Sequence, residues 1–568
     1  YTEEEIESLM ILFEVYFFYK MLNKEVYLKT SAEVCSQVAS YFDVVDNCIA
    51  TADTNKQYTV SPQTSYSPSP PIKQGSYTSV IISPNTHNTA DIYNGFIRVN
   101  MKCTFEMSSA IDSTSNFGTE RFPYRFDKLW FGFKDARDAV EKYEIVANGI
   151  TIYTQNFACE ESFLTGCCSN EVSKRADVYS KARHKDVFRH KFGYRCGKCV
   201  NLDNDASGKF TLNLKIDLRR FLPLSNIKYL PAFAGKIELR LYFSCAGMVY
   251  CPVGLDDKII NNPQHISKVT CDPITNEFTQ IGDPIRMWNK ITVTDKYTAA
   301  TASAAESYTI TSIKLESTQL ITVKITDYEV TECASIIPCF GIDNNIYNQL
   351  VARYSNPDHP LTFPTQTISF FTTTQPLRQP QDKSTITVTP RFVDSIFCLF
   401  PLKHTHHTYF KNPLFTHFQL NAGGYGNIPV KAFGTTGTDP EFIEYCQNAM
   451  NVNGDQNGFN KEVIASLCNT EKYNQNITGY YSNDRSSFFI GFATETDGTY
   501  QQGLTSLSPI NFEILCSQDT STGSFAKEVQ TPPILCLLYD VSISILVQPN
   551  GIPPLVRLGA YDLTTPEE

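Results

Sequence analysis

Hydrophobic and polar residues alternate along several short stretches of the chain. Residues 210–218 (FTLNLKIDL) and 237–243 (IELRLYF) place an apolar side chain at every second position, and residues 96–101 open the same series. Alternation with a period of two predicts strands that bury one face and expose the other. Between the first two stretches, Leu222-Pro223-Leu224 and Leu230-Pro231 mark a connection that crosses between two sheets.

A short hairpin is predicted in the same region. Residues 143–147 (YEIVA) and 150–153 (ITIY) flank Asn148-Gly149. Both turn residues tolerate a positive φ, which favours a two-residue type I′ turn. The aromatic run 129–133 (LWFGF) before it predicts a buried strand. Residues 157–168 and 171–190 lose the period of two and indicate loops and short helix.

A second series of short strands follows in the C-terminal half. The region from 251 to 307, rich in Pro, Asn and Asp, separates it from the first series. Two series with a linker between them predict two β-sandwiches. One helix is predicted at residues 439–450, inside a long Gly- and Asn-rich insertion at about 421–484. The predicted strands of the second series are 308–313, 320–325, 385–389, 395–400, 488–492, 510–515 and 541–547.

Composition supports two large β domains. The chain has 568 residues, of which 42% are hydrophobic, 12% aromatic and 19% charged. Single cores stop growing at roughly 250–300 residues. The 38 Phe and 31 Tyr favour strands over helices.

The first residues predict a helix of a different kind. Thr2 is a suitable N-cap before Glu3-Glu4-Glu5, and residues 9–22 are apolar apart from Glu14 and Lys20. The run is too short and too charged to span a bilayer, and its acidic start is unlike a signal peptide. Two interpretations stay open: a core or interface helix, or a helix that docks a membrane face or a partner. Residues 53–78, rich in Pro, Ser and Thr, indicate a linker or extended arm.

Net charge and cysteine usage exclude some functions. The formal net charge is −11 and the sequence pI about 5.4, and no basic run occurs. Because affinity for phosphate comes from Lys and Arg, direct or sequence-specific binding of nucleic acid is not expected. The 18 cysteines are scattered, several in apolar runs (Cys245, Cys398, Cys516, Cys536), as is typical of reduced thiols in an intracellular protein.

One cysteine-rich stretch is a candidate zinc site. Thiolate and imidazole are the ligands that zinc prefers, and C-x-x-C spacing lets two sulfurs reach one ion. The upstream pair is adjacent, however, and adjacent cysteines chelate poorly, which favours free thiols in a packed loop. The candidate ligands are Cys167, Cys168, Cys196 and Cys199, with His184 and His190 nearby.

Two further clusters carry possible chemistry. His404, His406 and His407 suggest a metal site, a pH-sensitive contact, or an exposed strand end or subunit contact, of which the last is favoured because no carboxylate lies close in sequence. The acidic residues Asp135, Asp138, Glu160 and Glu161 suggest paired carboxylates for glycoside hydrolysis. Lys134 and Arg137 beside them favour structural ion pairs instead.

No motif for a cofactor or nucleophile is present. Gly423-Gly424-Tyr425-Gly426 is followed by neither Lys-Ser/Thr nor a predicted helix, so it does not predict a phosphate loop. Asp484, Asp497 and Asp519 are too dispersed for a calcium site. We therefore expect no catalytic residue, no cofactor and no enzymatic activity.

Three segments resemble a known family. LWFGFKDARDAVEKYEIVANGITIYTQN (129–156), KARHKDVF (181–188) and DLRRFLPLSNIKYLPAFAGKIELRLYF (217–243) resemble the first jelly roll of double jelly-roll major capsid proteins. The resemblance is to those of eukaryotic DNA viruses and virus-like elements of the Polinton, Polinton-like, virophage and adintovirus kind. It extends over about residues 91–556 and is strongest in the first half.

The resemblance implies an all-β fold with two tandem eight-stranded jelly rolls and few short helices in the loops. The expected divisions are an N-terminal helical arm (1–52), a Pro/Ser-rich linker or arm (53–90), a first jelly roll (91–295), a second jelly roll carrying the insertion (296–556) and a C-terminal tail (557–568).

The resemblance also implies a function and partners. Three chains would form a homotrimer with a pseudo-hexameric outline that tiles an icosahedral shell. Neighbouring capsomers, minor capsid and penton proteins, and an internal membrane reached by the N-terminal helix are the expected partners. The protein would lie in the virion, after assembly in the host cytoplasm or nucleus. A jelly-roll glycan or glycopeptide hydrolase and a lectin-like receptor-binding module are the alternatives.

Overall fold

The computed structural model describes most strands of the chain and part of its connections. The described residues are 41–47, 59–66, 76–84, 87–108, 128–133, 136–167, 188–190, 193–201, 207–243, 249–252, 269–271, 285–288, 292–298, 307–315, 320–356, 360–377, 382–401, 407, 410, 417–423, 427–430, 433–434, 437–438, 440–450, 488–494, 503–517, 531–548 and 552–559.

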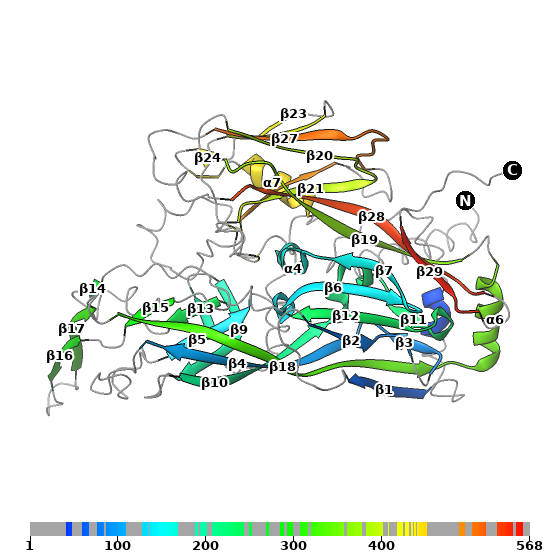
Figure 1. The fold of residues 1–568 in the computed structure, drawn as a ribbon, viewed down its shortest axis with the longest axis horizontal. Helices are drawn as coiled ribbons and strands as arrows, with labels where there is room; N and C mark the ends of the chain where they lie inside the picture. The colour runs from blue at the N-terminus through cyan, green and yellow to red at the C-terminus, as the bar shows by residue number, and fades with distance from the viewer. Residues whose placement is uncertain are drawn as a thin grey trace, which may run out of the picture.

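The C-terminal half forms a sandwich of eight strands (Figure 1). In chain order these are β19 (Leu361–Thr372), β20 (Lys383–Val388), β21 (Val393–Leu399), β22 (His417–Ala422), β23 (Asn427–Val430), β26 (Phe489–Ala493), β27 (Ile510–Ser517) and β28 (Ile534–Leu546). They pair in a nested way, first with eighth, second with seventh, third with sixth and fourth with fifth. The sheets β19-β28-β21-β26 and β20-β27-β22-β23 result, which is the topology of a jelly roll.

The N-terminal half repeats this topology. Its eight strands are β1 (Thr59–Tyr66), β2 (Tyr77–Ile81), β4 (Phe96–Met107), β6 (Val140–Ala147), β7 (Ile150–Gln155), β10 (Ser207–Asp217), β12 (Ile237–Phe243) and β18 (Leu320–Gly341). The same four nested pairs occur, all antiparallel. One sheet contains β1-β18-β4-β10 and the other β2-β12-β6-β7. The predicted all-β fold with two tandem jelly rolls is therefore confirmed.

The boundary between the two sandwiches differs from the prediction at residue 296. β18 pairs along β4 from Val323 to Ile336, so residues 320–341 complete the first sandwich instead of opening the second. The strand prediction at 320–325 was correct, but its assignment was wrong, because alternation shows that a strand exists and not which strand it pairs with. Helix α6 (Asn344–Tyr354) then leads into the second sandwich.

Residues 53–90 are not only a linker. β1 and β2 both lie in this range and supply the first two strands of the first sandwich. Among the described strands, β1 pairs only with β18, and Pro62 is tolerated there because an edge strand leaves one side without ladder bonds. Of the four prolines in residues 53–78, Pro62 lies in this edge strand, whereas Pro68, Pro70 and Pro71 lie outside the described residues.

The predicted hairpin is confirmed. β6 and β7 are joined by Asn148 and Gly149, whose φ values are 53° and 86°. Positive φ at both central residues is the signature of the type I′ turn. Gly235 (φ 79°) lies against this turn, and a Cβ on it would come within 2.3 Å of Asn148 Oδ1.

Extra strands extend one end of the first sandwich, opposite α6 (Figure 1). They come from three connections that nested pairing brings to one end, those after the third, fifth and seventh strands. One extra sheet contains β5 (Lys128–Phe133), β8 (Phe188–His190), β9 (Gly193–Asn201) and β13 (Val249–Pro252). Another contains β14 (Val269–Cys271), β16 (Thr292–Thr298) and β17 (Ser307–Leu315), so the predicted strand at 308–313 also belongs to the first half.

Short elements fill the remaining connections. They are β3 (Thr89–Asp91), β11 (Tyr229–Pro231), β15 (Ile285–Trp288), β24 (Phe433–Gly434), β25 (Gly437–Thr438), β29 (Leu555–Gly559), α4 (Ala158–Cys167), α7 (Pro440–Ala449) and the 3-10 turns η1 (Ala136–Ala139), η2 (Leu218–Arg220), η3 (Leu222–Leu224) and η4 (Ala232–Ala234). α7 confirms the helix predicted at 439–450. The helix predicted near residues 2–22 lies outside the described residues, although residues 41–47 are helical.

Candidate functional site: the junction between the two sandwiches

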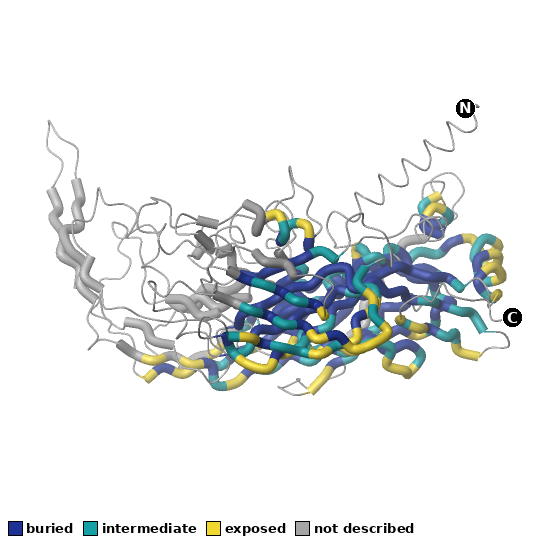
Figure 2. Tube along the Cα trace, turned by 90° about the horizontal axis from the view of Figure 1, so that it is seen from above, coloured by how far each residue is buried: buried dark blue, intermediate teal, exposed yellow. Residues whose placement is uncertain are grey.

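One pair of strands belongs to the cores of both sandwiches. β19 and β28 pair continuously from Leu361↔Ile545 to Thr372↔Ile534. Phe363 and Ile543 lie in the hydrophobic cluster of the first sandwich, whereas Ile368 and Leu535 lie in that of the second. Figure 1 shows this ribbon running from the upper sandwich towards α6, and Figure 2 shows buried residues (dark blue) along most of the described strands. The two halves therefore share a ladder and cannot separate without exposing core.

A buried polar cluster lies at the middle of this ladder. Gln366 Nε2 donates to Asp394 Oδ2 at 2.7 Å and to Asp540 Oδ1 at 3.1 Å. All three residues are at most 2% exposed. They join β19, β21 and β28 where the ladder passes from one core to the other. Because a buried polar group is costly unless it is hydrogen-bonded, this cluster fixes the register at the crossing point.

Hydrogen bonds from side chains to backbone carbonyls also cross between the sandwiches. Gln155 Nε2 donates to the carbonyl of Ile368 at 2.9 Å. Thr365 Oγ1 lies 3.0 Å from the Leu222 carbonyl oxygen, to which it donates. Asn226 Nδ2 donates to the Pro364 carbonyl at 3.2 Å. The Pro-rich crossing at residues 222–231, predicted as a connection between sheets, is thus also a contact with the second sandwich.

Helix α4 is inserted between the two halves. Phe163 and Leu164 lie in the second core, and the rings of Phe163 and Phe410 are 4.6 Å apart. On the other side, Ser162 Oγ donates to Asp138 Oδ1 of the first sandwich at 2.9 Å. One helix therefore contacts both sandwiches through opposite faces.

Arg137 and Glu161 form a buried ion pair next to α4. Arg137 Nη2 lies 2.9 Å from Glu161 Oε1, and neither side chain is more than 1% exposed. The guanidinium lies 4.8 Å from the ring centre of Phe221 and 5.4 Å from that of Tyr143, and it donates to the Arg220 carbonyl. Tyr143 Oη donates to Glu161, and burial, together with that carboxylate, raises the pKa of Tyr143 well above its ordinary value. The structural ion pair predicted for Arg137 is confirmed.

The carboxylates suggested for glycoside hydrolysis have structural contacts. Glu161 is bound by Arg137, Tyr143 and the Leu222 amide, and Asp138 accepts from Ser162. Glu160 contacts His407. Asp138, Glu160 and Glu161 are all buried, so their carboxylates do not line an open cleft for a sugar. Asp135 and Lys134 lie outside the described residues.

The side chains of the candidate zinc ligands lie outside the described part of the structure. Cys168 and His184 are not among the described residues, and only the backbone is described at Cys167, His190, Cys196 and Cys199. β9 holds Cys196 and Cys199 in one extended strand, opposite Phe133 and Trp130 of β5. A C-x-x-C zinc site needs a turn to bring its sulfurs together. Within the described residues, no group of three His, Cys, Asp or Glu side chains could hold a metal ion.

Seven cysteines are free and buried in the described part of the chain: Cys103, Cys159, Cys333, Cys339, Cys398, Cys446 and Cys536. Burial raises the pKa of Cys333 and Cys446 to about 12. A thiol with so high a pKa stays protonated at neutral pH and is unreactive. Reduced thiols were predicted at Cys398 and Cys536, and this is confirmed. Cys245 and the side chain of Cys516 lie outside the description.

The N-terminal segment 41–47 binds where the two sandwiches meet. Tyr41 and Phe42 pack on Phe363 of β19, with ring centres 6.2 and 6.1 Å apart. Asp46 accepts from Lys228 Nζ at 2.6 Å and from Tyr229 Oη at 2.7 Å. The local signal for this contact in the sequence is the pattern YFDVVD (41–46), in which two pairs of apolar residues are each followed by an Asp. No described helix has the length and hydrophobicity needed to cross a bilayer.

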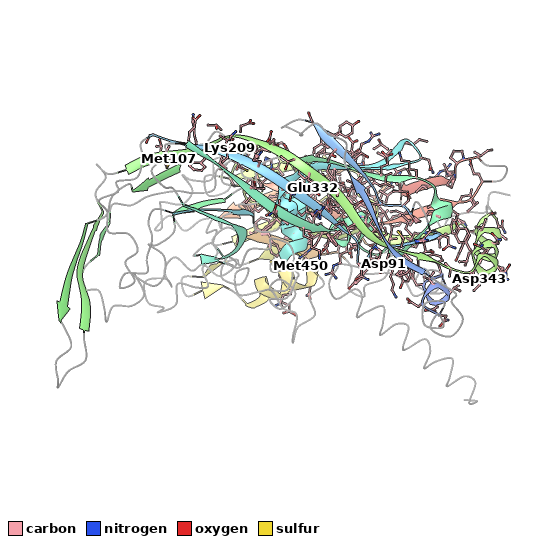
Figure 3. All side chains as sticks on the ribbon, turned by 90° about the horizontal axis from the view of Figure 1, so that it is seen from below. Asp91, Met107, Lys209, Glu332, Asp343 and Met450 are labelled. Atoms are coloured by element: carbon pink, nitrogen blue, oxygen red, sulfur yellow. The ribbon has the colours of Figure 1, made fainter. Side chains whose placement is uncertain are left out.

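The outer face of the β10-β4-β18 sheet is charged. Lys102 Nζ lies 3.4 Å from Glu329 Oε1, Lys324 Nζ lies 3.9 Å from Glu106 Oε2, and Arg98 pairs with Glu332. Figure 3 labels Glu332 and Lys209 among these side chains. Positive and negative charges alternate across neighbouring strands, which is typical of a solvated sheet face.

No family model and no curated protein matches the chain. Solved structures match it along most of its length. The mavirus major capsid protein is 12% identical, with a TM-score of 0.44 over 88% of this chain and 90% of that one. A chain in the cryo-EM structure of the Sputnik virophage is 11% identical, with a TM-score of 0.44 over 89% of each chain. The Faustovirus major capsid protein is 7% identical, with a TM-score of 0.38 over 89% and 90%.

Proposed function

We propose that the chain is a major capsid protein of the double jelly-roll kind, which trimerises into pseudo-hexameric capsomers. The observation that carries this proposal is the repetition of one eight-strand topology within a single chain. The family resemblance of residues 129–156, 181–188 and 217–243 supports it independently of the strand pairing.

The duplicated fold suits a closed trimer. Three chains with two similar sandwiches each present six similar units around one axis, and cyclic symmetry closes such a ring. The shared β19–β28 ladder and the inserted helix α4 hold the two sandwiches of one chain in a fixed relation. A fixed relation is what a tiling unit needs, because a hinge between the halves would leave the outline of the trimer undefined.

The role is proposed to be structural, not catalytic. The carboxylates that suggested a hydrolase are buried in contacts between elements. The proposed partners are other copies of the chain, minor capsid and penton proteins, and an internal membrane contacted by the N-terminal helix. The proposed location is the virion, after assembly in the host cytoplasm or nucleus. Direct binding of the genome is not part of the proposal, given a net charge of −11.

The test is the mass of the purified protein in solution, measured by light scattering, followed by negative-stain imaging. We expect a mass three times the 64.0 kDa of one chain and particles with a hexagonal outline. Obligate interfaces bury roughly 2,000–5,000 Å², so the trimer should survive dilution. A chain that stays monomeric at every concentration, or a dimer without threefold views, would overturn the proposal.

A further inference from the structure

The connection after the third strand of the second sandwich reaches back to the first sandwich. Its described residues are His407 and Phe410. Phe410 packs on Phe163 of α4 and forms a bridge with Pro401. The Phe488 amide donates to the Phe410 carbonyl at 3.0 Å. These contacts attach the connection at Phe410, three residues beyond a titratable side chain.

His407 makes the ionic contact of this connection. His407 Nδ1 lies 2.7 Å from Glu160 Oε1 at the start of α4. The Glu160 side chain is only 3% exposed, whereas that of His407 is 27% exposed. Water can therefore exchange protons with the histidine while the carboxylate stays enclosed.

We propose that His407 and Glu160 form a proton-operated clasp between the two sandwiches. With His407 protonated, the pair is ionic and holds the connection on α4. Loss of the proton leaves a buried carboxylate facing a neutral ring, and the contact between His407 and Glu160 weakens. Phe410 keeps the connection attached, so the sandwiches do not separate.

The acidic groups around the pair favour the protonated form of His407. Burial by itself lowers the pKa of His407, but the hydrogen bond and charge of Glu160, and then the charge of Glu141 on β6, outweigh burial and raise the pKa above its ordinary value. A buried carboxylate that loses its cationic partner is strongly destabilised. The contact therefore does not depend on an isolated histidine but on two acidic groups from two elements.

The sign of the pH effect follows from linkage. A histidine whose pKa is raised by folding stabilises the folded state fully below its unfolded pKa of about 6.5. This stabilisation is lost as the pH rises through the higher pKa of the folded state. The clasp is thus closed below about pH 6.5 and opens as the pH rises through the raised pKa of His407 in the folded state.

The experiment is hydrogen exchange of α4 and of the segment around His407 in the full-length protein, at pH 5.5 and pH 8.5, after correction for the intrinsic effect of pH on exchange. We expect protection in wild type to fall by about tenfold at the higher pH, the size of a hydrogen bond to a charged group. Glu160→Gln should remove most of this difference, since the charge that favours protonated His407 is gone. His407→Gln should remove it as well.

A matched control is His87→Gln, which changes another described histidine, in the first sandwich. It should retain the pH-dependent change at α4. If Glu160→Gln keeps the wild-type difference between the two pH values, or if wild type shows none, the clasp is overturned. The oligomeric mass is recorded for each variant, because a loss of trimer would concern the proposed function and not the clasp.

Discussion

At the scale of single residues, the main energetic feature of the junction between the two sandwiches is the burial of charged side chains. Arg137 is fully buried, packed against the rings of Phe221 and Tyr143 and paired with Glu161. Such a pair adds little net stability, since desolvation offsets much of its attraction. Removal of one partner is far more costly than the pair is worth, because the other charge stays buried without its counterion.

Arg137→Met is expected to destabilise the protein by about 3–5 kcal/mol, the usual effect of breaking a buried ion pair. The measurement is the urea midpoint followed by circular dichroism. Arg137→Met combined with Glu161→Leu should recover part of the loss, because no charge then stays buried. A double variant less stable than the single one would show that the hydrogen bonds from Tyr143 and the Leu222 amide to Glu161 outweigh the cost of its unpaired charge.

At the scale of elements, the β6–β7 hairpin does more than reverse the chain. Asn148 Nδ2 donates to the Pro554 carbonyl at 2.8 Å, and Asn148 Oδ1 accepts from the Lys236 amide at 2.9 Å. Pro554 immediately precedes β29, which pairs with β28. The turn of the first sandwich therefore holds β29, the last strand among the described residues, which is far away in sequence.

Asn148→Ala should cost about 1–3 kcal/mol by leaving these polar groups without partners, with a further cost for a positive φ at an Ala. Asn148→Gly is the control, since it keeps the backbone conformation and loses only the side-chain bonds. Hydrogen exchange at β29 and urea midpoints measure both. We expect faster exchange at β29 in both variants and a larger loss of stability for Ala; equal protection of β29 in all three proteins would contradict the contact.

At the scale of the whole molecule, the two sandwiches form one folding unit joined by β19 and β28. Phe363 lies on β19 yet packs in the first core, against Tyr41 and Phe42. Phe370 lies on the same strand, seven residues later, and packs in the second core. Substitutions of Phe363 and Phe370 therefore allow the coupling between the two cores to be measured within a single strand.

Phe363→Ala is expected to destabilise by about 3–5 kcal/mol, as is usual for a buried Phe. In this variant, hydrogen exchange should become faster mainly in the first sandwich, including β11 and residues 41–47, although Phe363 belongs to a strand of the second sandwich. Phe370→Ala should act mainly on the second sandwich. If both variants disturb the same sandwich, the ladder does not divide between the two cores as described.

Local signals in the sequence were sufficient to predict many elements. Asn148-Gly149 predicted the hairpin, the alternation at 210–218 and 237–243 predicted β10 and β12, and residues 439–450 predicted α7. These features depend on φ preference and side-chain period, which a short window contains. The sequence also predicted a structural ion pair at Arg137, and its partner in the structure, Glu161, is one of the acidic residues of that predicted cluster.

Only the tertiary structure decided which distant segments pair or contact one another. The assignment of residues 320–341 to the first sandwich depends on pairing with β4, more than 200 positions earlier, and no local pattern encodes a pairing partner. For the same reason, the local sequence predicts no contact between His407 and Glu160, which lie 247 positions apart. The sequence by itself determined two all-β sandwiches and most of their strands. Long-range pairing and burial decided where one sandwich ends, which strands both cores share, and which titratable groups meet between them.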